Sequence, residues 1–266
     1  MALTTEAGLI AARATRQIVN IRRASITSVA ALRYSNWNAT NLGPQQPASS
    51  APTVARLCGR SLSVNYTLPT GGALLYADMQ NGGCTIAGSW MVFDRLFDIG
   101  GLNGTLTTAQ TVNSQTVLTL PLSGRAAASE VEWFLEIYTA LGATTTTANV
   151  AVTYTDATTA TIGVTIPATV PAGRLLPIVS PTAGKIIASV QSVTLLASTL
   201  TAGNFGVTAG KQIIGLDVPV TVANIPIPQK QALLIPIGDN TCFWFVCNTS
   251  TTTTGEFNTS FTLIQG

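Results

Sequence analysis

Short apolar stretches separated by Gly, Pro and Asn follow one another along the chain from about residue 54. In SLSVNYTL (61–68) every second residue is apolar, and this alternation is typical of a strand with one buried face. Similar strand-like stretches cover residues 72–79, 84–99, 116–122, 131–141, 148–156, 160–168, 186–198, 203–218, 231–237, 241–248 and 256–265. Because no helical periodicity lies between them, the pattern predicts an all-β fold, an antiparallel β-sandwich with jelly-roll-like connections.

The beginning of the chain has a different pattern. Residues 4–19 predict a helix, because Thr4 or Thr5 can cap its N-terminus. Arg13 and Arg16 lie toward its C-terminal end, where a positive charge interacts favourably with the helix dipole. An isolated helix of this length is marginal in water, so we expect a partner to stabilise it.

Asn, Pro, Ser and Gly are concentrated in residues 36–53, a composition typical of a linker. We therefore expect a basic N-terminal arm, helical and extended, over residues 1–53. A β-sandwich domain over residues 54–266 follows, and a smaller C-terminal β subdomain from about residue 215 is an alternative division.

Composition adds a strong constraint. The 266 residues include 13 Lys and Arg, 11 Asp and Glu, no His and 41 Thr, so charged residues make up 9% of the chain. In globular domains, charged residues usually make up roughly a quarter of the chain. Because surface charge discourages self-association, so few charges indicate an assembly component, and a homo-oligomer is expected. A lightly charged secreted monomer is the alternative.

The charges are unevenly distributed. Residues 1–60 contain seven Arg against one acidic residue, Glu6, whereas the remainder is net acidic. The arm lacks the aromatic residues that stack on bases, which argues against nucleic-acid binding. We expect it to dock on an acidic protein surface through residues that combine charge and apolar contact: Arg13, Arg16, Ile18, Arg22, Arg23 and Arg33.

One cluster of carboxylates invites a catalytic interpretation. Glu130, Glu132 and Glu136 share one face of a predicted strand, and a pair of carboxylates is what glycosidases use. Such pairs normally face each other across a cleft, whereas the outer face of an amphipathic strand explains this spacing. Without histidine, the sequence predicts no enzyme, no catalytic residues and no small-molecule substrate.

The segment FDRLFDIGG (93–101) holds a second group of charges. Calcium would need denser oxygen donors, so we expect Asp94 to pair with Arg95 or another Arg, and Asp98 to begin a Gly turn. No nucleotide-binding motif appears anywhere in the chain. We predict no cofactor and no bound metal.

Four cysteines, Cys58, Cys84, Cys242 and Cys247, show no metal-binding spacing. Buried free thiols are the favoured interpretation, and a disulfide between Cys58 and Cys84 is the alternative. The predicted strand CFWFVC (242–247) is apolar on both faces, so one face should meet another sheet and the other a neighbour or helix. This predicts a subunit contact at Trp244.

No apolar stretch reaches the ~20 residues of a membrane-spanning helix, so no membrane partner is expected. The first residues lack the basic and apolar regions of a signal peptide. We therefore expect assembly in a cytosol.

Several segments resemble a group of structural proteins of tailed bacteriophages. The similarity lies in EVEWFLEIYTALGATTTTANVAVTYTD (130–156), PAGRLLPI (171–178), SVQSVTLLASTLTAGNFGVT (189–208) and the region from MVFDRLFDIGGLNGT to AQTVNS (91–114), and it spans residues 54–215. It implies a virion component, a β-sandwich that decorates or cements the capsid shell. The basic arm departs from the pattern of that group, and this leaves the position within the virion open.

Pattern and resemblance together predict a capsid decoration or cement protein, assembled in the host bacterial cytoplasm, with the major capsid protein or other virion subunits as partners. The alternative is a phage tail, fibre or adhesin-type binding module that recognises a host surface through projecting loops such as 101–114 and 144–147. A glycan-degrading enzyme that uses the Glu130–Glu136 cluster is a third hypothesis.

Overall fold

The computed structural model describes residues 5–27, 32–35, 37, 53–62, 66–68, 75–84, 88–218, 222–226, 235–249 and 254–265. These residues are mostly β-structure with one short α-helix, and the strands pair antiparallel. The expected antiparallel β-fold is therefore confirmed.

The elements follow in chain order: α1 (Glu6–Ala14), β1 (Gln17–Thr27), β2 (Leu32–Ser35), β3 (Arg56–Leu57), η1 (Arg60–Leu62), β4 (Leu75–Cys84), β5 (Gly88–Leu102), β6 (Gln110–Thr111), η2 (Ser114–Thr116), η3 (Ala128–Glu130), β7 (Val131–Thr139), β8 (Thr146–Tyr154), β9 (Thr159–Ile166), β10 (Arg174–Ile178), β11 (Ile187–Leu195), β12 (Asn204–Val218), β13 (Val222–Pro226), β14 (Ile235–Ile237), β15 (Phe243–Thr249) and β16 (Thr254–Gln265).

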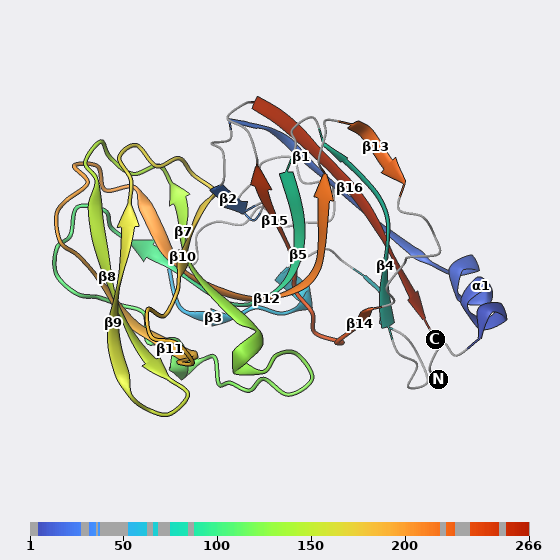
Figure 1. Ribbon diagram of the computed structural model, residues 1–266, viewed down its shortest axis with the longest axis horizontal. Coiled ribbons are helices and arrows are strands. Elements are labelled where there is room, and N and C mark those ends of the chain that lie inside the picture. Colours follow the sequence, from blue (N-terminus) through green and yellow to red (C-terminus); the bar gives the residue numbers. More distant parts are fainter. Residues whose placement is uncertain are drawn as a thin grey trace.

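Six strands in the middle of the molecule close into a barrel (Figure 1). They follow the order β12-β7-β10-β2-β15-β5, and β5 pairs with β12 to complete the ring. The two long strands β5 and β12 approach closely at Gly206, where a Cβ atom would lie 1.7 Å from the carbonyl oxygen of Ile99. Because the described strands form a closed barrel with flanking sheets, they do not make a clear jelly roll.

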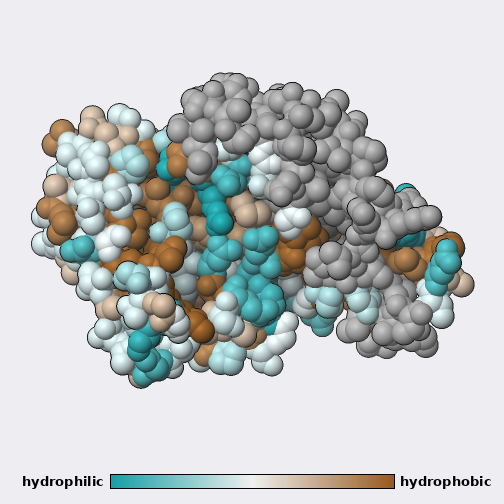
Figure 2. Space-filling model, viewed as in Figure 1, coloured by the Kyte–Doolittle hydropathy of each residue, from teal (hydrophilic) through white to brown (hydrophobic). Residues whose placement is uncertain are grey.

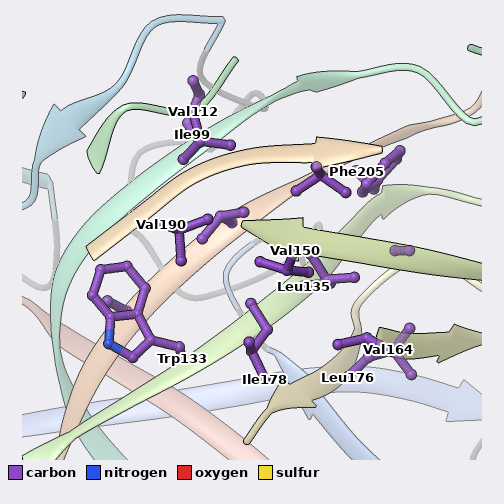
Figure 3. Packing of buried hydrophobic residues seen from close by; sticks show 14 of the residues in the cluster. Ile99, Val112, Trp133, Leu135, Val150, Val164, Leu176, Ile178, Val190 and Phe205 are labelled. Atoms are coloured by element: carbon purple, nitrogen blue, oxygen red, sulfur yellow. The ribbon is translucent and has the colours of Figure 1, made fainter. Parts of the chain in front are cut away.

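A separate sheet lies on either side of the barrel (Figure 1). The four-stranded sheet has the order β6-β11-β8-β9, and the five-stranded sheet has the order β1-β16-β4-β13 with β14 also paired to β4. The main core lies between the barrel and the four-stranded sheet, where Trp133, Leu135, Val150 and Val190 pack together (Figure 3). A smaller core joins the barrel to the five-stranded sheet.

Strand β7 illustrates why these residues form a barrel wall. Side chains alternate along a strand, so Trp133, Leu135 and Ile137 face the four-stranded sheet. Phe134 and Tyr138 belong to a second cluster, with members on β5, β7, β10 and β15, that fills the barrel interior. A strand that is apolar on both faces is thereby buried on both faces, as expected for a central wall.

The N-terminal segment is more regular than the sequence predicted. The helix begins after the N-cap Thr5, whose Oγ1 accepts a hydrogen bond from the Gly8 N–H, and it ends at Ala14 rather than near residue 19. Residues 17–27 then pair with β16, and residues 32–35 lie between β10 and β15 in the barrel. Much of the expected arm therefore supplies strands to two sheets.

Two predicted strands are absent where the structure describes them. Within 61–68, Arg60–Leu62 is a 3-10 turn and residues 66–68 are irregular. In 116–122, the apolar residues pack on the main core without joining a sheet, and Leu122 forms an isolated bridge with Ala126. Leu118 is buried there, and Pro121 has no N–H to donate to a ladder.

Candidate functional site

Five buried polar side chains meet inside the barrel, and we call them the barrel cluster: Arg95 and Asp98 on β5, Glu136 and Tyr138 on β7, and Thr208 on β12. Arg95 Nη2 donates to Glu136 Oε2 at 2.7 Å and to the Tyr138 hydroxyl at 2.9 Å. Its Nε donates to Asp98 Oδ2 at 3.0 Å. Thr208 Oγ1 donates to the same Glu136 oxygen at 2.6 Å. One guanidinium therefore joins carboxylates from two strands that lie far apart in the sequence.

Two indole rings enclose Arg95. Its Cζ lies 4.4 Å from the centroid of the Trp37 ring and 4.9 Å from that of Trp244. A guanidinium stacked on aromatic faces gains cation–π attraction where water is excluded. The Trp244 Nε1–H donates to Ser35 Oγ at 2.8 Å, so β2 helps to position the ring.

The surroundings favour the ionised forms of Arg95 and Asp98 and the neutral form of Tyr138. Burial alone would lower the pKa of Arg95, but Glu136, Tyr138 and Asp98 hold it well above its ordinary value. Burial opposes ionisation of Asp98 as well, yet Arg95 and Arg56 lower its pKa. Burial, followed by the charge of Glu136, raises the pKa of Tyr138, so the phenol stays protonated. These shifts favour a charged Arg95, an ionised Asp98 and a protonated Tyr138.

Asp94 points away from this cluster and is held by Arg125. The guanidinium binds the carboxylate with both ends, at 2.9 Å from Nε and 2.6 Å from Nη2. Asp94 Oδ1 also accepts from the Cys242 N–H at 2.8 Å. The expected pairing of Asp94 with an arginine is confirmed, and Arg125 is the partner. Asp98, by contrast, lies within β5 and pairs with Arg95 and Arg56 rather than beginning a turn.

The three glutamates do not share a solvated face. Glu136 is wholly buried in the barrel cluster, which corrects the expectation of an outer strand face. Glu132 pairs with Arg33 at 2.5 Å, and Glu130 pairs with Lys211 at 2.8 Å. Each carboxylate is thus bound by its own cation. This arrangement is suited to holding strands together.

The residues predicted to bind a partner fall in different environments. Arg16 and Ile18 are exposed beside the helix, and Arg16 Nη1 donates to the Arg13 carbonyl. Arg22 and Arg23 lie on β1, opposite β16, and their side chains are outside the described set. Arg33 is part of the barrel, where it stacks 5.7 Å from the Phe134 centroid as well as pairing with Glu132. Arg33 therefore lies in the barrel while the other five lie on or beside α1 and β1, and the docking role expected of these residues stays a prediction.

Trp244 has no exposed surface. Its ring lies against Phe93, Phe134 and Arg95, and both faces of β15 are covered by the chain itself. The expected subunit contact at Trp244 is corrected, because a side chain enclosed within its own fold cannot touch a second copy.

A shallow groove of about 250 Å³ lies on the surface where η3 and β7 meet β10 and the start of β11. Val179 and Ile186 present exposed apolar side chains there. Lys185, the cation at the rim, binds Asp156 and thereby lowers the pKa of that carboxyl to about 2. The groove is thus lined mainly by apolar and neutral groups.

Loops at one end of the four-stranded sheet carry three exposed leucines, Leu106, Leu196 and Leu200, which we call the leucine loops. Hydrogen bonds join the loops, since Gly104 N–H donates to the Ala202 carbonyl and Thr199 N–H donates to the Gly104 carbonyl. The projecting loop expected at 144–147 is shorter than predicted, because β8 begins at Thr146. On this side of the molecule, Figure 2 shows exposed hydrophobic residues among residues of intermediate hydropathy.

Comparison with family models, curated proteins and solved structures found no match for this chain. Within the described residues, no group of three or more His, Cys, Asp or Glu is placed to hold a metal ion. None of the helices in that part of the chain has the length and apolar character to span a bilayer.

Proposed function

We propose that this chain is a non-enzymatic structural component of a tailed-phage virion, a decoration or cement protein that stabilises the capsid shell. Its partners are the major capsid protein or other virion subunits, together with further copies of itself. It assembles in the host bacterial cytoplasm and remains in the virion. The sequence resemblance supports the class of particle, and the physical argument for assembly is independent of that resemblance.

One observation carries the proposal: several charged side chains are buried in the fold, while several large apolar side chains are exposed at the surface. Asp94, Arg95, Asp98, Glu136 and Arg174 are buried although charged residues are scarce in the whole chain. Charged side chains are almost never fully buried unless they are paired. Because these charges are buried, the surface carries even fewer charges than the composition of the chain suggests. Such a surface favours protein contacts over solvation.

Exposed apolar side chains complete the argument. Val179, Leu196 and Leu200 are 67%, 64% and 73% exposed, and Leu200 also has a positive φ of 72°. A bulky residue in that conformation is strained, and it persists only where the surrounding structure enforces it. Apolar groups fixed on loops in this way are suited to burial against a neighbouring subunit.

The test is incorporation into particles. Virions lacking the chain are mixed with the full-length protein, and bound protein is located by cryo-electron microscopy and counted by gel densitometry. The double variant Leu196→Ser/Leu200→Ser should bind at least tenfold less, whereas Thr107→Ala, an exposed change on the adjoining loop, should bind normally. Equal binding of both variants would remove the leucine loops from the interface. Binding to host cells without binding to capsids would instead support the tail or fibre alternative.

A further inference from the structure

Two short strands meet end to end along one edge of β5. β3 pairs there through Arg56 with Asp98 and Leu57 with Phe97, and β15 begins with Phe243 opposite Asp94. The junction between these strands falls at Cys58 and Cys242, which come from distant parts of the sequence.

Backbone hydrogen bonds fix both cysteines at adjacent places on β5. The Cys58 N–H donates to the Leu96 carbonyl at 2.9 Å, and the Arg95 N–H donates to the Cys242 carbonyl at 2.8 Å. Arg125 Nη1 donates to the Cys58 carbonyl at 2.7 Å, while the Cys242 N–H donates to Asp94. The Asp94–Arg125 ion pair therefore holds both cysteine backbones at once.

The two thiols lie against each other in the interior. Both residues have no exposed surface and belong to the cluster that fills the barrel. After burial, interaction with the Cys242 side chain is the next cause that raises the pKa of Cys58, which places the two thiols as neighbours. Cys247 is also buried, but its Sγ points to the Tyr34 carbonyl, 3.8 Å away. The described thiols thus comprise one facing pair and one separate group.

We propose that Cys58 and Cys242 form a disulfide under oxidising conditions and that this bond joins β3 to β15 across their junction. The pairing differs from the Cys58–Cys84 alternative suggested by the sequence. Cys84 pairs with residues of the five-stranded sheet, and its side chain is outside the described set. The bond would lock the short β3 onto the barrel and close a long loop of the chain.

The reaction is a thiol–disulfide exchange with a small-molecule disulfide such as oxidised glutathione. One cysteine thiolate attacks a sulfur of glutathione disulfide and releases one glutathione thiolate. The second cysteine thiolate then attacks the protein sulfur of the mixed disulfide and releases the other. The protein loses two protons and two electrons, and one glutathione disulfide becomes two glutathione molecules.

The surroundings also set when this reaction occurs. Burial, and then Cys242, raises the pKa of Cys58, which makes its thiolate scarce in the closed fold. β3, however, has only two paired residues, and Leu57 is exposed. Opening of so short a strand breaks the Arg56–Asp98 ion pair but requires less free energy than global unfolding, so β3 provides the route by which the oxidant reaches the pair.

Full-length protein is incubated with oxidised glutathione, both natively and in denaturant low enough to open β3 without global unfolding, and is then digested without reduction. Mass spectrometry should find the Cys58–Cys242 peptides linked, with the loss of two hydrogens. Oxidation should raise the denaturation midpoint, and dithiothreitol should reverse this shift. Cys247→Ser, the matched control, should keep both effects.

Cys58→Ala and Cys242→Ala should each lose the linked peptide and the reversible shift in midpoint. If either variant fails to fold, the wild-type peptide map still decides the question. Absence of the linked peptide under both conditions, or a link of either cysteine to Cys84 or Cys247 instead, would overturn the proposal.

Discussion

Arg95 has two carboxylates and two tryptophan rings around it and no exposed surface, so removal of one carboxylate leaves a buried charge poorly compensated. We expect Asp98→Asn to lower the free energy of unfolding at neutral pH by about 3–5 kcal/mol, the usual cost of breaking a buried ion pair. Urea denaturation measures this. Glu132→Gln is the matched control, because its pair with Arg33 is partly exposed and should contribute about 1 kcal/mol or less. Similar losses for both variants would show that burial does not decide the strength of these pairs.

Acid should destabilise the fold through the same residue. The pKa of Asp98 is lowered in the folded state, so the unfolded chain takes up its proton first as pH falls. The stabilisation is complete above the unfolded value of about 3.9 and is lost as pH falls through the folded pKa. Unfolding free energies measured from neutral pH down to acid should fall less steeply for Asp98→Asn than for wild type. Parallel curves would contradict this assignment.

The candidate site could be predicted from the sequence only in part at the level of residues. Charges placed within the apolar run around Asp94 indicated a structural ion pair, and that interpretation was correct. The partner Arg125 lies in a polar loop, and Glu136 lies on another strand, so their contacts depend on strand order rather than on local pattern. The mistaken outer face of the glutamates has the same cause: alternation along a strand does not say which face a barrel encloses.

The N-terminal elements differ sharply in how much they contribute to the stability of the fold. Deletion of residues 1–16 removes α1, whose packing involves Leu9 and Ala12 against Tyr76 and Ile264. We expect that variant to retain its β-sheet circular dichroism and cooperative unfolding. Deletion of residues 1–35 also removes β1 and β2, which exposes the edge of β16 and opens the barrel, so we expect aggregation. Size-exclusion chromatography distinguishes these outcomes, and a soluble, cooperatively folding 36–266 fragment would contradict the barrel topology.

Strands with regular alternation were the predictable ones. β8 buries every second residue, and β9 and β11 follow nearly the same pattern on the four-stranded sheet. β2 and β10 were not found, because each is short and gains its stability from neighbours distant in the sequence. Closure of the barrel depends on those two strands, and for this reason the sequence suggested an open sandwich instead.

For the whole molecule, an apolar surface predicts that association depends little on ionic strength. If the exposed leucines and Val179 drive self-association, sedimentation of the purified chain should show oligomers that persist from low to high sodium chloride concentration. Contacts based on surface ion pairs would weaken instead, because salt screens exposed charges. Dissociation at high salt would therefore assign the interface to the basic residues near the N-terminus. A monomer at every protein concentration would argue against self-association.

Strand β2, with four residues, is the shortest of the barrel strands, and it pairs with β10 through Arg33 and Tyr34. Ser35, at its end, accepts a hydrogen bond from the indole of Trp244, and Trp37 lies two residues further along the chain. When β2 separates from its neighbouring strands, the hydrogen bond between Ser35 and Trp244 breaks and both indoles around Arg95 become more accessible to solvent. Two of the four tryptophans of the chain are these indoles, so opening of the barrel should contribute to quenching of the intrinsic fluorescence by a small solute such as acrylamide, without any attached label.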